Sequence, residues 1–594
     1  MPKVLRRIVG LALRHRLLVA GAIGSSLLAA IAGLTLPKLY GHAVDQAQHL
    51  IVHGALGGEA ARQALVTSAV LVAVTAATRG VLTGLSGFLA EACSQKVAYE
   101  LRLQFFRQLQ RLSFSFHDRM HSGELITRGM LDLEATRGFI QGGMMQSLTL
   151  LLLIVSSATL MVATDARMAA LALAFVPIAG FALTRMGMLL RLAWLKVQQT
   201  MSALTLTIEE NLQGVRVVRA FAGKAFEMAK FDKAADETLL ESFKRIKLRL
   251  RASATMNLSF YGSMALLLWY GGHQVIAHRI TVGRLTEFLT YMTMLQAPIR
   301  QITLIVSAAS RTTSSGGRLF EILDLQPIIF DPPAAKPLVS KPGGVRFEDV
   351  DFAYEPGKPV LRGISFQVGP GQTLGIVGPP GSGKSTIANL IPRFYDVTSG
   401  RITINDQDVR SVTLASLRTH VGLVQQDAFL FDETVRSNVA YADPVAEDER
   451  VHESARAAQI HDYIEDLPLG YGSRVGERGV ALSGGQRQRM SIARGLTPRP
   501  GVLVFDDSTA AVDGVTERKV REAIAAVGAT RTVVIISHRL SALMHADEIL
   551  VLSEGRIAER GTHASLVKLG GVYSELYALQ SRSTAVTSSA LARA

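Results

Sequence analysis

A glycine-rich segment containing one lysine runs from Gly378 to Thr386 and has the sequence GPPGSGKST. An apolar run precedes it and a periodic segment follows it, which predicts a strand, a tight turn and a helix. Glycines allow backbone N–H groups to turn inward around a phosphate at a helix N-terminus. In such a loop Lys384 can reach the terminal phosphates and the Ser385 hydroxyl can bind Mg²⁺. The segment therefore predicts a nucleotide site that uses Mg²⁺.

Two further apolar runs end in residues that suit the same chemistry. The first ends in Asp506 and Asp507, and the second is followed by His538. A carboxylate at a strand end can orient Mg²⁺ beside the Ser385 hydroxyl, and a histidine there can sense the γ-phosphate. Both residue types can also be structural, since aspartate is common in turns. The phosphate loop favours the functional interpretation.

The segment 482–486, LSGGQ, is a second candidate for phosphate binding. Two adjacent glycines open a helix here, and Ser483 adds a hydroxyl donor. One nucleotide does not obviously need two such helix termini from a single domain. The purpose of the second terminus must therefore be sought outside this nucleotide site.

These residues require a scaffold of strands and helices. From residue 345 to about 580 strand-like runs alternate with helical ones, which predicts an α/β domain. The proline-rich stretch 326–344 predicts a linker after a first domain, 1–325. The tail, 581–594, has too few apolar residues to pack, and we expect it to be disordered.

The chain as a whole is too apolar for an ordinary soluble enzyme. Of its 594 residues, 48% are hydrophobic and 19% are charged, which points to a membrane part. The formal net charge of +14 is not concentrated in a basic, aromatic-interleaved stripe. Basic residues flanking membrane spans explain it better than nucleic-acid binding does. The single cysteine, Cys93, excludes an internal disulfide and a multi-cysteine metal site.

Six apolar segments predict six transmembrane helices, each near the ~20 residues needed to cross a bilayer. They are 17–37, 64–90, 143–163, 168–190, 254–276 and 285–309. Basic residues before the first span place the N-terminus in the cytosol, and six spans return the C-terminus to the same side. Two long, charged connections of helical pattern, 91–141 and 191–251, then extend into the cytosol. A soluble domain there could push on them.

At these residues the chain resembles the ATP-binding cassette (ABC) family, over nearly its whole length. Transporters of that family carry a phosphate loop, here 378–386, and a Leu-Ser-Gly-Gly-Gln signature, here 482–486. The resemblance implies ATP and Mg²⁺ as cofactors and gives the site residues a role each. They are Tyr354, Gly378, Gly381, Ser382, Gly383, Lys384, Ser385 and Thr386 for ATP; Ser385, Gln426 and Asp506 for Mg²⁺; Asp507, His538 and Gln426 for catalysis; Ser483, Gly484, Gly485 and Gln486 as signature; and Asp513 in the D-loop.

The membrane half resembles half-transporters of the exporter branch in the segments 123–128, 214–221 and 283–291. The resemblance implies a type IV exporter fold: an all-α six-helix transmembrane domain with long cytosolic extensions, fused to an α/β P-loop ATP-binding domain. In that family the signature of one subunit closes over the ATP of another, so a dimer is implied. Coupling helices, here near 118–123 and 220–224, would dock on the ATP-binding domains and drive alternating access.

The chain departs from the family pattern after the Walker B strand. Asp507 stands where the family normally has a glutamate that orients the attacking water. The side chain is one methylene shorter, and a displacement of about 1 Å can cost ~100-fold in rate. The D-loop is also altered, because Ser508 to Asp513 has the sequence STAAVD instead of ATSALD. Pro380 removes one N–H from the phosphate loop.

Two hypotheses account for Asp507. In the first, which we favour, the chain is one subunit of a heterodimer: it holds its own ATP, while its unaltered signature serves the hydrolysing site. In the second, the chain forms a homodimer with two slow sites. Both make the chain an ABC-type ATPase and translocase of the bacterial cytoplasmic membrane, with both termini in the cytosol.

The substrate is only weakly indicated. Arg79, Arg185 and Arg300 fall in or at the ends of predicted spans, where a lipid-facing charge is costly. They can join helices to each other, or Arg79 and Arg300 can line a cavity for an anionic amphiphile such as a lipid. Drugs and peptides are also open, as is an importer-like member of the exporter fold such as one for siderophore uptake. The spans argue against a non-transporting ATPase that acts on DNA.

Overall fold

The computed structural model describes residues 3–52, 59–339, 343–476, 479–480, 482–507, 518–519, 522 and 531–591. The chain divides into two compact units. The helical unit comprises Met1–Gln110 and Ser122–Leu325, and the α/β unit comprises Arg111–His121 and Gln326–Ala594. The short segment 111–121 therefore packs with the α/β unit although its neighbours in sequence belong to the helical unit.

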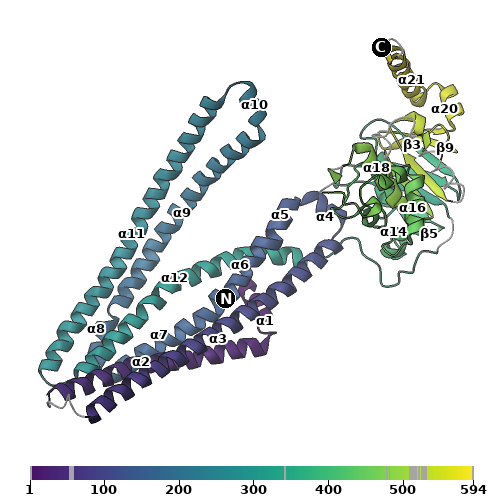
Figure 1. Ribbon diagram of the computed structural model, residues 1–594. Helices are drawn as coiled ribbons and strands as arrows, with labels where there is room; N and C mark the ends of the chain where they lie inside the picture. The colour runs from purple at the N-terminus through teal and green to yellow at the C-terminus, as the bar shows by residue number, and fades with distance from the viewer. Residues whose placement is uncertain are drawn as a thin grey trace. The chain divides into compact units, whose positions relative to one another are not determined.

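The described part of the helical unit consists of helices joined by short turns (Figure 1). In chain order they are α1 (Lys3–Ala12), α2 (Arg16–Val52), α3 (Glu59–Arg111), α5 (Ser122–Thr127), η1 (Arg128–Asp132), α6 (Leu133–Gly138), η2 (Phe139–Met145), α7 (Gln146–Thr164), α8 (Ala166–Leu173), α9 (Phe175–Gln213), α10 (Val215–Ala220), α11 (Lys224–Ile276) and α12 (Val282–Asp324). The segments η1 and η2 are π-helical.

Four helical segments of the described chain are long and apolar enough to cross a membrane. They are Arg16–Ile51, Arg62–Arg111, Ser122–Thr164 and Ala166–Gln213, and they contain the first four predicted spans. The fifth and sixth predicted spans lie within α11 and α12. Polar residues such as Gln274 and Glu287 lower the hydropathy of these two helices, so their place in the membrane stays a prediction.

The turns between helices have local causes. Asp165 begins α8 as its N-cap, and its carboxylate accepts from the backbone N–H groups of Arg167 and Met168 at 2.9 and 3.0 Å. The long helices α9 and α11 lie side by side and are joined at one end by α10 (Figure 1). The predicted coupling helix near 220–224 is wrong in its bounds: α10 ends at Ala220, and a turn follows it.

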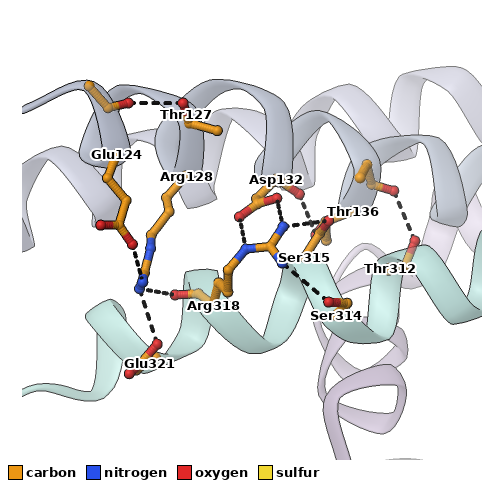
Figure 2. Close-up of polar contacts among 12 residues, drawn as sticks. Glu124, Thr127, Arg128, Asp132, Thr136, Thr312, Ser314, Ser315, Arg318 and Glu321 are labelled. Atoms are coloured by element: carbon orange, nitrogen blue, oxygen red, sulfur yellow. Dashed lines mark hydrogen bonds and ion pairs between the residues drawn. The ribbon is translucent and has the colours of Figure 1, made fainter. Parts of the chain in front are cut away.

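A polar cluster joins α12 to the continuous helical segment formed by α5, η1 and α6 (Figure 2). Arg318 on α12 donates from Nε and Nη2 to the two carboxylate oxygens of Asp132, at 2.8 and 2.5 Å. The Asp132 side chain is only 5% exposed. Two parallel, charge-assisted hydrogen bonds fix the relative orientation of the two helices as well as their distance. We call Asp132 and Arg318 the clamp pair.

The π-helical segment η1 carries both charged residues that face α12. Its first residue, Arg128, donates to Glu124 at 2.6 Å and to Glu321 on α12 at 3.0 Å (Figure 2). A π turn holds more residues than an α turn, and it therefore changes the direction in which the following side chains point. Arg128 and Asp132 are four residues apart on this short segment, and both contact α12.

The first helix completes this contact at the end of α12. Arg7 on α1 donates to both carboxylate oxygens of Asp324, at 2.6 and 2.8 Å, and its guanidinium lies 4.0 Å from the centre of the Phe320 ring. A Cβ at Gly316 would lie 2.8 Å from a methyl carbon of Val4, so glycine permits the close approach of α1 and α12. Near its end, just before the linker, α12 packs against both α1 and α6.

The α/β unit contains the remaining described elements. They are α4 (Phe114–Arg119), β1 (Val345–Phe352), β2 (Leu361–Val368), β3 (Thr373–Val377), α13 (Lys384–Leu390), β4 (Ser399–Ile404), β5 (Gln407–Asp408), α14 (Leu414–His420), β6 (Val421–Val424), α15 (Val435–Val439), α16 (Asp448–Ala457), α17 (His461–Glu465), η3 (Gly470–Gly472), α18 (Gly484–Leu496), β7 (Val502–Asp506), β8 (Thr532–Ile536), η5 (Leu540–Ala542), β9 (Glu548–Ser553), β10 (Arg556–Gly561), α20 (His563–Leu569) and α21 (Val572–Leu591).

Two sheets form the scaffold of this unit. One has the order β2-β1-β4-β5 and is antiparallel, and the other has the order β10-β9-β3-β8-β7-β6. In the second sheet β9, β3, β8, β7 and β6 are parallel. Strands of this kind are buried on both faces, which explains their continuous apolar runs. Because the strands are parallel, the residues that follow β3, β7 and β8 meet at one edge of the sheet.

The last helix differs from the sequence-based expectation. α21 runs from Val572 to Leu591 and continues through most of the segment 581–594, for which we expected disorder. Its first turn is anchored in the α/β unit by Tyr573, which is fully buried. Adding residues to an existing helix costs little, because the unfavourable nucleation step has already occurred. Helix propagation therefore outweighs the low apolar content of the tail.

Candidate functional site

The phosphate loop lies between β3 and α13, as the sequence predicts. Gly381 and Gly383 adopt positive φ angles of 80° and 99°, which residues with a Cβ rarely adopt. A Cβ at Gly378 would lie 2.2 Å from the carbonyl oxygen of Leu552 on β9. The glycines are therefore required by backbone conformation and by close packing against the neighbouring strand.

The Lys384 side chain lies inside the phosphate loop and bonds to its backbone. Its ammonium donates to the carbonyl oxygens of Gly378 and Pro379 at 2.9 and 2.8 Å, and the residue is 5% exposed. Burial lowers the pKa of Lys384, while the nearby carboxylates of Asp506 and Asp507 oppose the shift. A bound phosphate would bring a further negative charge to this buried cation.

The buried hydroxyl of Ser382 indicates that the loop fits a phosphate. Its residue is 3% exposed, and its hydroxyl has no hydrogen-bond partner among the described residues. A buried hydroxyl without a partner is costly, and a phosphate oxygen in the loop would satisfy it. The loop geometry, Lys384 and Ser382 together fit a nucleotide.

The predicted metal residues come from three neighbouring segments. The Ser385 hydroxyl donates to a carboxylate oxygen of Asp506 at 3.1 Å. Burial raises the pKa of Asp506, and the hydrogen bond from Ser385 opposes that shift. Gln426 is exposed on the loop that follows β6, whose last residue Val424 pairs with Phe505 on β7. A hydroxyl, a carboxylate and an amide oxygen are donors that suit Mg²⁺, so these residues would hold it.

Asp507 is directed toward the strand next to it. Its backbone has a φ angle of 44°, which costs energy for a residue with a side chain. One carboxylate oxygen accepts from the Ser537 hydroxyl at 3.2 Å and from the His538 backbone N–H at 3.4 Å. Asp507 is 7% exposed. The carboxylate is therefore held by the first two residues after β8.

His538 is exposed, and α21 supports its backbone. The Gln580 amide donates to the His538 carbonyl oxygen at 2.7 Å and accepts from the Leu540 backbone N–H at 3.0 Å. These bonds fix the loop after β8 but leave the imidazole free to face a ligand. Sequence reasoning identified His538 and missed Ser537 and Gln580. Gln580 had no recognisable signal in the sequence, whereas Ser537 could have been found as the polar end of an apolar strand.

Tyr354 lies beside the phosphate loop, just after β1. It is 47% exposed, and its hydroxyl is 3.2 Å from the hydroxyl of Thr386. Its ring meets the rings of Phe352 and Tyr395 edge-on, with centres 4.8 and 5.1 Å apart. A partly exposed, firmly placed ring next to a phosphate loop suits stacking on a base. The sequence identified Tyr354 but not Tyr395.

The signature segment forms the start of α18. The Ser483 hydroxyl accepts from the Gln486 backbone N–H at 3.3 Å, and the Gln486 side chain accepts from the Ser483 backbone N–H at 2.7 Å. This reciprocal arrangement is a capping box. It leaves the N–H groups of Gly484 and Gly485 at the open end of the helix, which suits an anion.

Three predicted residues remain: Asp513 of the D-loop, and Arg79 and Arg300 of the possible substrate cavity. Asp513 lies outside the described residues, and so does the side chain of Arg300. Arg79 on α3 packs against α2, since its Nε would lie 3.2 Å from a Cβ at Gly33. This contact is compatible both with helix-to-helix packing and with a cavity-lining role, so the cavity stays a prediction.

Two family models match this sequence. The model described as ABC transporter transmembrane region matches residues 18–299, and the model described as ABC transporter matches residues 361–510. An ATP-dependent lipid A-core flippase of Syntrophus aciditrophicus is 35% identical over 82% of this chain and 81% of its own. A Bacillus subtilis ATP-binding/permease protein, YgaD, provisionally named for multidrug export, is 33% identical over 92% of this chain and 94% of its own.

One solved structure is also similar. It is a bacterial Atm1-family ABC exporter with ATP bound, with a TM-score of 0.79 and 29% sequence identity. The likeness covers 95% of this chain and 99% of that chain.

Proposed function

Since the chain belongs to the ABC transporter family and is an ATPase coupled to transport, we propose that it exports or flips an amphiphilic molecule across the bacterial cytoplasmic membrane. Two relatives are named for a lipid flippase and for multidrug export. We propose a lipid or a drug, with a peptide as a further candidate.

The observation that carries the proposal is the phosphate loop with its partners. Lys384 is buried within the loop, Ser382 has an unsatisfied hydroxyl, and Ser385 bonds to Asp506. When bound, Mg²⁺ would offset the negative charge of the phosphates. The protein residues bind and orient the nucleotide around it: Lys384 supplies a cation, the loop supplies N–H donors, and Tyr354 supplies a surface for the adenine base.

Exporters of this fold act as dimers, and the signature gives the reason here. The start of α18, with Ser483 exposed, is a second anion-binding terminus in the same unit. No hydrogen bond joins it to the phosphate loop among the described residues. We propose that it serves the ATP that is bound by a second subunit, and that this chain's own ATP is covered by the signature of that subunit.

We further propose that the second subunit is a different chain and that this chain's own ATP is hydrolysed slowly. The support is Asp507, which is shorter than the usual glutamate and bonds to Ser537 and the His538 N–H. We propose that a carboxylate held in this way is poorly placed to orient a water molecule at the γ-phosphate. The unaltered signature at Ser483 to Gln486 is what a partner's hydrolysing site would need.

The test is ATP hydrolysis by the purified chain alone, in lipid nanodiscs with Mg²⁺. We expect a low rate that Asp507→Asn changes little and that Asp507→Glu increases, by up to ~100-fold if position alone limits the reaction. Lys384→Ala, which removes the buried cation, should abolish nucleotide binding and serves as the control. A high rate that Asp507→Asn abolishes would instead support a homodimer with two working sites.

Substrate and direction need separate measurements. If Arg79 and Arg300 line a cavity for an anionic amphiphile, replacing both by alanine should reduce the stimulation of ATPase activity by anionic lipids. Unchanged stimulation would remove them from the substrate site. An importer of the same fold would move its substrate toward the cytosol. In inverted vesicles, whose cytosolic face is outside, an exporter carries substrate into the lumen and an importer carries it out, so the direction of flux decides between export and import.

A further inference from the structure

The loop that follows α13 is unusually well fixed for an irregular segment. Arg393 is 6% exposed and pairs with Asp396 through Nε and Nη2 at 2.7 and 3.1 Å. Arg418 on α14 donates to the Arg393 carbonyl oxygen at 3.3 Å, and its guanidinium lies 5.3 Å from the centre of the Phe394 ring. We call residues 393–396 the docking loop. These contacts fix Arg393, Phe394 and Asp396 against the rest of the α/β unit.

The short helix α4 lies on one side of the docking loop. The Phe114 ring stacks on Phe394, with centres 4.1 Å apart and an angle of 21° between the planes. The Tyr395 hydroxyl donates to the Asp118 carboxylate. Burial and this carboxylate raise the pKa of Tyr395, so the hydroxyl remains a donor. All of these contacts lie within the α/β unit.

The other side of Tyr395 faces the nucleotide site. Its ring meets Tyr354 edge-on, with centres 5.1 Å apart and an angle of 89°, and also contacts Phe352 at 5.8 Å. The Tyr354 hydroxyl is in turn 3.2 Å from that of Thr386 in the phosphate loop. Tyr395 therefore contacts both the aromatic beside the phosphate loop and the helix that carries Asp118.

We propose that Tyr395 is a positioning residue that links the base side of the nucleotide site to α4. Its ring holds Tyr354 in the orientation that stacks on adenine, and its hydroxyl holds Asp118. The inference rests on the proposed role of Tyr354. Because coupling between two sites is reciprocal, ATP bound against Tyr354 steadies α4, and a docked α4 strengthens ATP binding.

The first test is a double-mutant cycle on nucleotide binding by the full-length transporter in nanodiscs. Tyr395→Ala should weaken ATP binding by roughly 2- to 10-fold, as expected for an edge-on aromatic contact. The double variant Tyr354→Ala/Tyr395→Ala should bind ATP as tightly as Tyr354→Ala alone, because the ring that Tyr395 positions is already absent. Inorganic tripolyphosphate, which has no base, should bind all of these variants equally.

Each outcome of the cycle is informative. Independent, multiplying effects of the two substitutions would overturn the link while leaving the role of Tyr354 intact. Equal losses for ATP and tripolyphosphate would also overturn it, since Tyr395 would then support the phosphate loop. If Tyr354→Ala binds ATP normally, the adenine role of Tyr354 fails, and the inference fails with it.

The second test uses Tyr395→Phe, which keeps the ring and removes only the hydroxyl. Hydrogen exchange of residues 111–121 is measured with and without a non-hydrolysable ATP analogue. In the unmodified protein the analogue should slow exchange in α4, and in Tyr395→Phe this slowing should be lost. Because the coupling is reciprocal, nucleotide affinity should fall by no more than the factor by which the analogue slowed exchange. Tyr573→Phe is the matched control, because it removes another tyrosine hydroxyl, 2.8 Å from His563 Nδ1. Equal slowing in Tyr395→Phe and in the control would refute the link.

Discussion

Replacing Arg318 by alanine should destabilise the helical unit more than the exposure of this residue suggests. Arg318 is 46% exposed, but the carboxylate that it binds is 5% exposed. Truncating Arg318 leaves the charge of Asp132 buried without its two charge-assisted bonds. Breaking a fully buried pair costs ~3–5 kcal/mol, whereas an exposed pair contributes only ~0–1 kcal/mol. The mixed exposure of this pair places the expected loss between them, at about 2–3 kcal/mol.

The assay is reversible unfolding of the purified transporter in mixed micelles, with a double-mutant cycle for the clamp pair. Arg318→Ala and Asp132→Ala should each destabilise, and the double variant should be less destabilised than the sum, because no charge remains buried alone. The matched control is Lys230→Ala. Lys230 is also 46% exposed, but its partner Glu210 is 54% exposed, so the control should leave the free energy of unfolding unchanged.

Two results would refute this reasoning. One is a loss for Arg318→Ala no larger than that of the Lys230→Ala control. The other is strict additivity of the two clamp substitutions, which would mean that Asp132 is solvated after Arg318 is removed. In either case the contact between η1 and α12 would be incidental.

Two further predictions concern the nucleotide site. Asp506→Asn should raise the thermal stability of the nucleotide-free protein at neutral pH and remove the extra stabilisation by Mg²⁺ with ATP: burial raises the pKa of Asp506, so its ionised form lowers stability at neutral pH, and this cost disappears as the pH falls below the ordinary range of aspartate. Melting curves at pH 7.5 and at successively lower pH, down to the ordinary range of aspartate, check this, and a stability difference that does not shrink over that range would contradict it. Gly383→Ala should abolish nucleotide binding, measured by fluorescence titration, because position 383 has a φ angle of 99° and a Cβ there would lie 2.5 Å from a methyl carbon of Leu361; Gly381→Ala, where a Cβ meets no atom within 4 Å, isolates the effect of φ alone.

The parts of the site that depend on local sequence could be predicted. The phosphate loop, Asp506 and His538 each lie at or just after the end of an apolar strand, and parallel strands place their ends at one edge. The signature glycines and Ser483 likewise form a local helix start. These predictions required only the chain within a few residues of each site.

The parts that depend on distant residues could not be predicted. Tyr395 and Asp118 are 277 residues apart, and Asp132 and Arg318 are 186 apart. A single sequence contains no signal that pairs such residues. The π-helical segment η1 was also missed, because nothing in its five residues distinguishes a π turn from an α turn.

The capping box of α18 has a consequence for the conformational entropy that is lost when two subunits associate. Ordering a side chain during association costs ~0.5–1.5 kcal/mol in conformational entropy. Ser483 and Gln486 already restrain each other within one subunit, so this entropy is lost during folding and not when two subunits meet. The signature is thus already rigid before the two subunits close. The free energy of ATP binding is then available for aligning the signature of one subunit with the nucleotide site of the other.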